Sequence, residues 1–152
     1  RRRGIHQPEK EISMKIYTSY FGNAKALAKE GIKIVSIACW QPRFLSVPVV
    51  MSDVAPTPWM VKKASHQQYL DAYRQILSRL DPYEFIERLE RTCGGSDVAL
   101  CCYEKPDDFC HRHLLAQYLT QQTGVEIKEF VSTPPAPKKP EKIEPPSLFD
   151  DL

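Results

Sequence analysis

The stretch VALCCYEKPDDFCHRHLLA, residues 98–116, decides the fold. Its opening, Val98–Tyr103, is an unbroken apolar run, which is typical of a strand buried on both faces in a parallel sheet. Leu114 and Leu115 begin an apolar stripe of helical spacing beyond the polar loop. A buried strand that leads into a helix is the unit of a parallel α/β sheet, and ligands of such sheets bind at the carboxyl ends of the strands.

Further strands are predicted on both sides of this stretch. Met14–Tyr20 is rich in β-formers, and Ile32–Trp40 is almost unbroken in its apolar character. Residues 125–130 alternate in the manner of an edge strand. The segment from Gln41 to Ala64 is rich in proline, and we expect an irregular functional loop or lid there.

Helices are predicted between the strands. Ala24–Lys29 favours a short helix, and capping patterns at residues 65–68 (SHQQ) and 81–84 (DPYE) indicate the starts of two more. A further helix is predicted over Phe109–Thr123, ending at Gly124. We therefore predict a small three-layer α/β fold with a mostly parallel sheet of about four or five strands flanked by helices.

The composition of the chain limits the classes of protein to which it can belong. Of 152 residues, 42% are hydrophobic and 26% are charged, which suits one globular domain. The net charge of +2 is too small to indicate nucleic-acid binding by itself. No apolar run approaches the roughly 20 residues of a membrane helix, so we predict no membrane association. Five cysteines, an odd number, predict free thiols in a reducing, cytoplasmic compartment.

The two ends of the chain differ from the middle in composition. Residues 1–13 carry several charges and little to bury, so we expect a flexible basic arm that precedes a core domain over residues 14–132. Residues 133–152 contain six of the thirteen prolines, which predicts a disordered Pro-rich tail. Apolar residues return at its tip, at Leu148 and Phe149.

The start of the helix after Val98–Tyr103 carries positive charge at an unusual place. With Asp108 as N-cap, Cys110, His111 and Arg112 lie in the first turn, where the helix dipole is positive. A bound anion would stabilise this arrangement, with Arg112 as its substrate-binding side chain. The alternative is that Asp107 and Asp108 offset the charge without any ligand.

Three residues near this turn are candidates for catalysis. The helical wheel places His111 towards the sheet, within possible reach of Glu104, and such a pair is suited to acid–base work. Cys110 is a candidate nucleophile at a helix amino end. A structural histidine hydrogen bond and a cysteine that merely packs are the alternatives.

The cysteines and histidines around this helix start do not predict a metal site. Cys102, Cys110, His111 and His113 supply soft ligands, but they form no CxxC pair, and the two histidines point to different faces of the helix. The chain also contains no P-loop and no dinucleotide-binding glycine motif. We predict neither a metal nor a cofactor.

The ends of the other strands offer further substrate-binding candidates. Tyr20 and Asn23 follow the first predicted strand, and Trp40 and Arg43 follow the second. Arg43 would add a cation, and the aromatic rings would stack on a base. Core or lid packing is the alternative for both rings.

Two motifs resemble a known family. The segment LCCYEKPDDFCHRHLLA, Leu100–Ala116, resembles the signature of the "domain of unknown function 488" family, and IYTSYFGN, Ile16–Asn23, resembles one of its branches. The resemblance implies a compact α/β domain with a cleft built on Glu104, Cys110, His111 and Arg112. Many members carry Asp-x-Arg after the second strand. This chain has Ser36–Gln41 there, so a polar partner of the site is missing or replaced by Arg43.

The tip of the tail resembles a second kind of motif. Ser147-Leu148-Phe149 is similar to the end of peptides that dock into bacterial sliding clamps, although their leading glutamine is absent. Our leading hypothesis is an enzyme that acts on a phosphate-bearing substrate, a nucleotide or nucleic acid. The alternative is a non-catalytic module that binds nucleic acid or a phosphorylated ligand and is recruited by its tail to a partner such as a sliding clamp.

Overall fold

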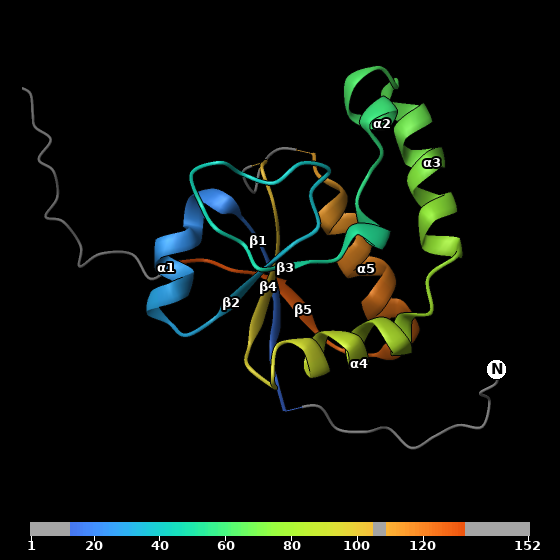
Figure 1. The fold of residues 1–152 in the computed structure, drawn as a ribbon. Coiled ribbons are helices and arrows are strands. Elements are labelled where there is room, and N and C mark those ends of the chain that lie inside the picture. Colours follow the sequence, from blue (N-terminus) through green and yellow to red (C-terminus); the bar gives the residue numbers. More distant parts are fainter. Residues whose placement is uncertain (1–12, 105–108, 133–152) are drawn as a thin grey trace, which may run out of the picture.

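The computed structural model describes residues 13–104 and 109–132, which form one parallel sheet with helices on both faces (Figure 1). The sheet has five strands in the order β3-β2-β4-β1-β5, and each pairing is parallel. The strands are β1 (Ile16–Tyr20), β2 (Lys33–Ser36), β3 (Val49–Val50), β4 (Val98–Cys102) and β5 (Ile127–Glu129). The predicted α/β fold with a small parallel sheet is confirmed.

Strand β4 lies at the centre of the sheet. All five of its residues are buried, because β1 and β2 pair with its two edges and helices cover its faces. The register places Cys102 beside Tyr20 of β1, and Cys101 beside Ser36 of β2. The carboxyl ends of the three central strands therefore meet at one edge of the sheet.

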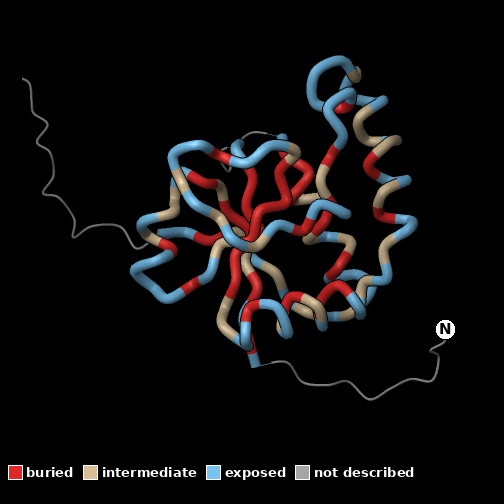
Figure 2. The backbone as a smooth tube through the Cα atoms, in the orientation of Figure 1, coloured by how far each residue is buried: buried red, intermediate tan, exposed pale blue. Residues whose placement is uncertain are grey.

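The helices divide into two layers. They are α1 (Ala24–Lys29), α2 (Pro58–Lys62), α3 (His66–Ser78), α4 (Pro82–Thr92) and α5 (His111–Thr123), with 3₁₀ turns η1 (Phe21–Asn23) and η2 (Ser52–Val54). Helices α3, α4 and α5 bury apolar side chains on one face of the sheet. Helix α1 and η1 contribute to a smaller cluster on the other face. Figure 2 shows the buried backbone converging on the strands between these layers.

The structure corrects three boundaries predicted from the sequence. The second strand spans Lys33–Ser36 rather than Ile32–Trp40, although Ile37 N still donates to Cys101 O at 3.0 Å. The segment from Gln41 to Ala64 is less irregular than predicted, since it contains β3 and α2. Helix α5 begins at His111 rather than Phe109.

Gly124 ends α5 in a left-handed conformation, with φ of 79°. A Cβ at this position would meet no atom within 4 Å, so the cost of a side chain is conformational rather than steric. We expect Gly124→Ala to lower the free energy of unfolding by about 1 kcal/mol. Gly124→Asn should cost less, because asparagine tolerates this conformation. Urea unfolding followed by circular dichroism checks both values, and equal stability of all three chains would contradict the expectation.

The predicted tails lie outside the described residues. The basic arm falls almost entirely within residues 1–12, and the Pro-rich tail within residues 133–152. The docking of Leu148 and Phe149 to a sliding clamp therefore stays a prediction, as do the domain boundaries. Among the helices of the described residues, none combines the length and the apolar character needed to cross a membrane.

Candidate functional site

A pocket of about 290 Å³ opens at the carboxyl edge of the sheet. Its lining comes from the loops after β2 and β4, from the Pro56–Ala64 region, and from the starts of α3 and α5. The titratable and aromatic residues of the lining are Cys39, Trp40, His66, Tyr69, Cys102, Tyr103, Glu104, Phe109, Cys110 and His111. Of the site residues predicted from the sequence, Trp40, Glu104, Cys110 and His111 line this pocket.

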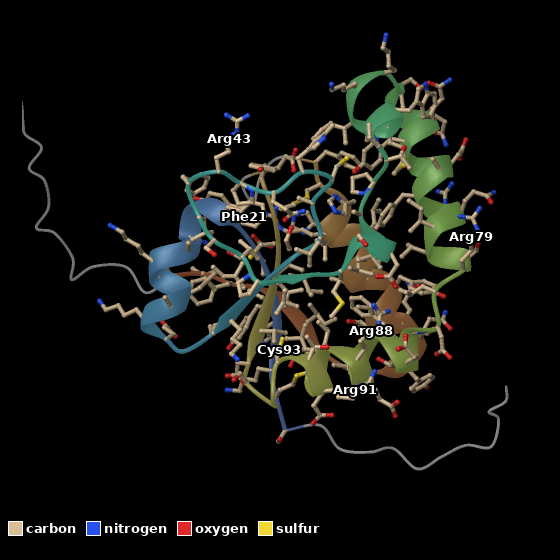
Figure 3. The ribbon with its side chains drawn as sticks, in the orientation of Figure 1. Phe21, Arg43, Arg79, Arg88, Arg91 and Cys93 are labelled. Atoms are coloured by element: carbon tan, nitrogen blue, oxygen red, sulfur yellow. A yellow bond between two sulfur atoms is a disulfide. The ribbon has the colours of Figure 1, made fainter. Side chains whose placement is uncertain are left out.

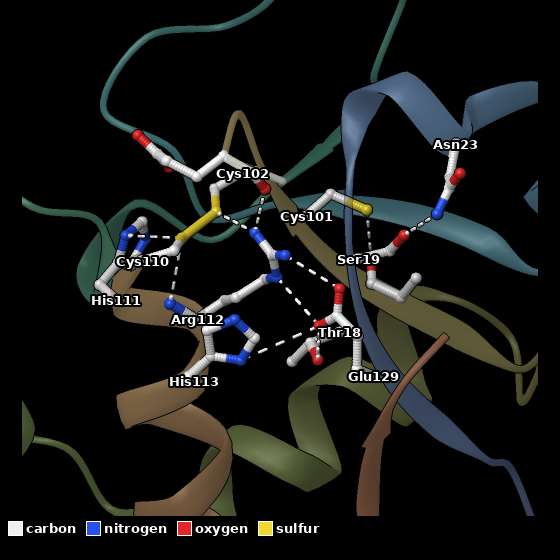
Figure 4. Close-up of polar contacts among 12 residues, drawn as sticks. Thr18, Ser19, Asn23, Cys101, Cys102, Cys110, His111, Arg112, His113 and Glu129 are labelled. Atoms are coloured by element: carbon white, nitrogen blue, oxygen red, sulfur yellow. Dashed lines mark hydrogen bonds and ion pairs between the residues drawn. A yellow bond between two sulfur atoms is a disulfide. The ribbon is translucent and has the colours of Figure 1, made fainter. Parts of the chain in front are cut away.

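Cys102 and Cys110 meet at the floor of this pocket, where their sulfur atoms are bonded (Figure 4). Cys102 is the last residue of β4, and Cys110 immediately precedes α5, so the strand-to-helix connection brings the two side chains together. Their Cα atoms are 7.6 Å apart. The prediction that every cysteine is a free thiol is wrong for this pair, whereas Cys39, Cys93 and Cys101 are free.

The N-cap of α5 is Cys110, not Asp108. The Cys110 sulfur accepts a hydrogen bond from the backbone N–H of Arg112 at 3.4 Å, which satisfies one of the unpaired donors of the first turn. Asp107 and Asp108 lie outside the described residues, so their compensation of the helix charge stays a prediction. With this N-cap, His111 and Arg112 are the first and second residues of the helix, and both are buried.

Arg112 is completely buried, and its donors are used within the protein. Its Nε and Nη2 atoms bind the two carboxylate oxygens of Glu129 at 3.1 and 2.9 Å. Its Nη1 atom donates to the backbone oxygen of Glu104 at 2.6 Å and to the sulfur of Cys102 at 3.1 Å. The positive charge at this helix end is therefore balanced by Glu129, and the predicted contact of Arg112 with a bound anion is replaced by an internal ion pair (Figure 4).

His111 is buried and faces the sheet, as the helical wheel predicts, but its partner is not the Glu104 carboxylate. Its Nε2 lies 2.6 Å from the backbone oxygen of Ile37, and its Nδ1 lies 3.7 Å from the sulfur of Cys110. Because a carbonyl oxygen only accepts, Nε2 carries the proton and Nδ1 presents a lone pair to the sulfur. Burial lowers the pKa of His111 to about 4, so the ring is neutral at neutral pH. Glu104 is exposed at the pocket rim.

The remaining predicted substrate-binding residues separate into two groups. Trp40 lines the pocket, with the Lys62 ammonium 5.3 Å from its ring centre. Asn23 instead donates to Ser19 Oγ at 3.0 Å, and the Tyr20 ring lies beside Gly22. Arg43 is exposed and projects away from the body of the protein (Figure 3).

Sequence reasoning missed an aromatic wall of the pocket. The ring of Phe109 packs edge-on against His66 and Tyr69 of α3, with ring centres 4.7 and 5.1 Å away. Burial raises the pKa of Tyr69, and the nearby Glu104 carboxylate adds to the effect, so the phenol stays protonated. The capping pattern at Ser65 placed the start of α3 but gave no sign that this start borders the site.

Glu129 is a second residue that sequence reasoning missed. Besides Arg112, it accepts a hydrogen bond from Thr18 Oγ1 of β1 at 2.6 Å, and its Oε1 lies 3.9 Å from Nδ1 of His113. Its place in β5, 17 residues after Arg112, carries no local signal of this role. Glu129 holds the guanidinium that contacts Cys102.

Residues 16–123 match the family model DUF488-N3a, described as "Active DUF488-N3 subclade". The match spans the chain from β1 to the end of α5, including both cysteines of the pocket floor, and stops before Glu129. No curated protein and no solved structure matches the chain. Because the family model covers well over half of the sequence, the chain belongs to the DUF488 family.

Proposed function

We propose that this protein is a cysteine-dependent enzyme that uses the thiolate of Cys102 as a nucleophile on a small, ring-bearing anion such as a nucleotide. The observation that carries the proposal is the 3.1 Å contact between the Arg112 guanidinium and the Cys102 sulfur at the floor of an open pocket. A thiolate is the reactive form of cysteine, and an adjacent guanidinium stabilises it.

The surroundings of the pair favour thiolate over thiol. A guanidinium is a permanent positive charge in proteins. The ion pair of Arg112 with Glu129 fixes this charge against Cys102. The amino end of α5 adds the positive end of a helix dipole, with Cys110 as its N-cap. Cys102 is the better nucleophile candidate because the formal charge contacts its sulfur directly. Cys110, the nucleophile predicted from the sequence, receives a backbone N–H instead.

The proposed reaction is a substitution in two steps. In the reduced pair, the Cys102 thiolate forms a bond to an electrophilic atom of the substrate, and the leaving group departs with the electrons of the bond that breaks. Water then attacks the same atom and restores the thiolate, so the net change is hydrolysis. Glu104, at the rim, gives a proton to the leaving group in the first step and takes a proton from the attacking water in the second, which restores its starting form. The disulfide form has no free thiolate and is inactive until it is reduced.

The shape and charge of the pocket support the substrate class. Trp40, Tyr69, Tyr103 and Phe109 provide ring faces and edges for a planar group. The starts of two helices, α3 and α5, both border the cavity, and Lys62 lies beside Trp40. These features favour an anion that enters from the rim and binds near the two helix starts. The sequence had predicted that such an anion would contact Arg112.

A first experiment measures sulfur reactivity without a known substrate. We expect iodoacetamide at pH 7 to alkylate Cys102 of the reduced protein at least about tenfold faster than Cys93, a buried free thiol outside the pocket. Peptide mass spectrometry reads both sites in the same sample. Equal rates at Cys102 and Cys93 would refute the activated thiolate.

A second experiment tests the catalytic role. The reduced protein is screened against nucleotides and short oligonucleotides, and we expect Cys102→Ser to lower the hydrolysis rate by about a thousandfold. The matched control, Cys93→Ser, should retain the wild-type rate. Full activity of Cys102→Ser would overturn the proposal. Loss of activity in Cys110→Ser alone would return the nucleophile to Cys110.

A further inference from the structure

We propose that Cys102, Cys110 and His111, in the reduced protein, form a three-ligand site for a soft divalent cation such as Zn²⁺, with its fourth position open to the pocket. The two sulfurs and a ring nitrogen of His111 lie within 4.8 Å of one another, and all three residues are buried. The inference concerns the same sulfurs as the proposed reaction. It does not need that reaction, because binding is measured without substrate.

The spacing of the ligand atoms suits a tetrahedral ion. Zinc–sulfur and zinc–nitrogen bonds of about 2.3 and 2.05 Å at the tetrahedral angle place the two ligand atoms about 3.6 Å apart. The Cys110 sulfur and the His111 Nδ1 atom are 3.7 Å apart. This pair therefore already has the separation that a shared ion requires.

The backbone of the cysteine pair also leaves room for an ion. The Cα atoms of Cys102 and Cys110 are 7.6 Å apart, whereas roughly 4.4–6.8 Å is usual across a disulfide. Two sulfurs that share one zinc ion lie about 3.8 Å apart, so their backbones stand further apart than in a disulfide. Reduction breaks the bond between the two sulfurs, so the Cys102 side chain is then free to rotate away from Cys110.

The hydrogen bonds around the three ligands orient them for a metal. The Nε2–H of His111 donates to the Ile37 carbonyl, which leaves Nδ1 unprotonated and directed at the sulfurs. A ligating histidine typically donates its other ring N–H to such a partner. Each sulfur also accepts a hydrogen bond from Arg112, Cys102 from the guanidinium and Cys110 from the backbone.

The charges at the site balance when the ion is bound. Two thiolates neutralise the divalent cation, and Glu129 neutralises Arg112 behind them. The sequence argued against zinc because the chain has no CxxC pair and because His111 and His113 point to different faces of the helix. In the structure His113 lies beside Glu129, whereas His111 lies beside the Cys110 sulfur. The two cysteines and His111 then supply three ligands, which is the number that an open zinc site requires. The prediction that no metal binds is the one that this proposal opposes.

The test uses the full chain, reduced and freed of metal, with Co²⁺ as a spectroscopic probe. We expect about one Co²⁺ per chain, with near-ultraviolet thiolate-to-cobalt absorption and tetrahedral visible bands that Zn²⁺ abolishes. The oxidised wild-type chain is a matched control of identical sequence. It should give no such bands, because its sulfurs are not thiolates. Absence of the bands from the reduced chain would overturn the site.

Variants assign the ligands. Cys102→Ser, Cys110→Ser and His111→Asn should each weaken Zn²⁺ binding by more than tenfold in competition with a chelating dye, while Cys93→Ser should bind as the wild type does. Unchanged binding in Cys102→Ser or Cys110→Ser would refute the assignment. Alkylation mapping of the reduced wild type keeps the test independent of folding: Zn²⁺ should protect Cys102 and Cys110, and chelation should restore their labelling. Unprotected cysteines would count against the proposal.

The two proposals of this site fail separately. If the reduced chain binds no Co²⁺ but its hydrolysis depends on Cys102, the metal site is refuted and the proposed thiolate enzyme stands. If the chain binds Zn²⁺ through all three ligands, but iodoacetamide alkylates Cys102 of the metal-free form no faster than Cys93, the proposed thiolate enzyme is refuted and the metal site stands.

Discussion

Replacing Arg112 with alanine should lower the free energy of unfolding by about 3 kcal/mol, the lower end of what is lost when one partner of a buried ion pair is removed. The guanidinium is fully buried, while Glu129 keeps about a fifth of its side-chain surface, 22%, in contact with solvent. The substitution leaves the Glu129 carboxylate without its cation, the Glu104 carbonyl without its donor, and a cavity beneath the start of α5. Urea unfolding of the reduced protein measures the loss.

Two further substitutions sharpen this test. Arg74→Ala removes an exposed ion pair with Asp71 and should change the free energy of unfolding by less than about 0.5 kcal/mol. Arg112→Lys keeps the charge but cannot reach both Glu129 oxygens and the Cys102 sulfur at once, so its stability should fall between those of Arg112→Ala and the wild type. A loss below about 1 kcal/mol in Arg112→Ala would show that the ion pair does not hold the structure together.

Leu115→Ala should cost about 3 kcal/mol by a different mechanism. Leu115 is fully buried where α5 packs on the sheet, and truncation leaves a cavity in a close-packed core. Gln117, two residues further along the same helix and exposed, is the matched control. Gln117→Ala should stay within about 0.5 kcal/mol of the wild type. Thermal and urea unfolding of the two variants give the comparison, and similar losses in both would contradict the assigned packing.

These two expectations concern the site as well as the fold. Helix α5 carries Cys110, His111 and Arg112 at its start, and its apolar face fixes their direction. Loosening the helix at Leu115 should therefore also slow the alkylation of Cys102, since the guanidinium no longer holds its position against the sulfur. In Gln117→Ala the alkylation rate should remain that of the wild type.

The parts of the fold that were predictable depend on local pattern. The unbroken apolar run of β4 indicated a strand covered on both faces, and it is the central strand of a parallel sheet. The alternation over residues 125–130 indicated an edge strand, and β5 lies at the edge. Gly124 marked the end of α5, because glycine accepts the left-handed conformation at less cost than a residue with a side chain.

The errors occurred where local rules allowed more than one answer. Asp108 and Cys110 both precede the helical stripe, and aspartate is the commoner N-cap, yet the helix begins after Cys110. That shift of two residues decides which backbone N–H groups are capped, and the Cys110 sulfur accepts a hydrogen bond from that of Arg112. The partner of His111 lies 74 residues away at Ile37, a separation at which spacing in the sequence carries no information.

By itself, the sequence determined the class of fold and the strand and helix that border the candidate site. Each of these follows from hydrophobic periodicity, which acts over a few residues. Only the tertiary structure decided that Arg112 binds Glu129 rather than a ligand, and that Cys102, Cys110 and His111 share one pocket floor. The physical reason is that buried charges and polar atoms need partners, and packing of the whole domain selects which distant residue supplies each of them.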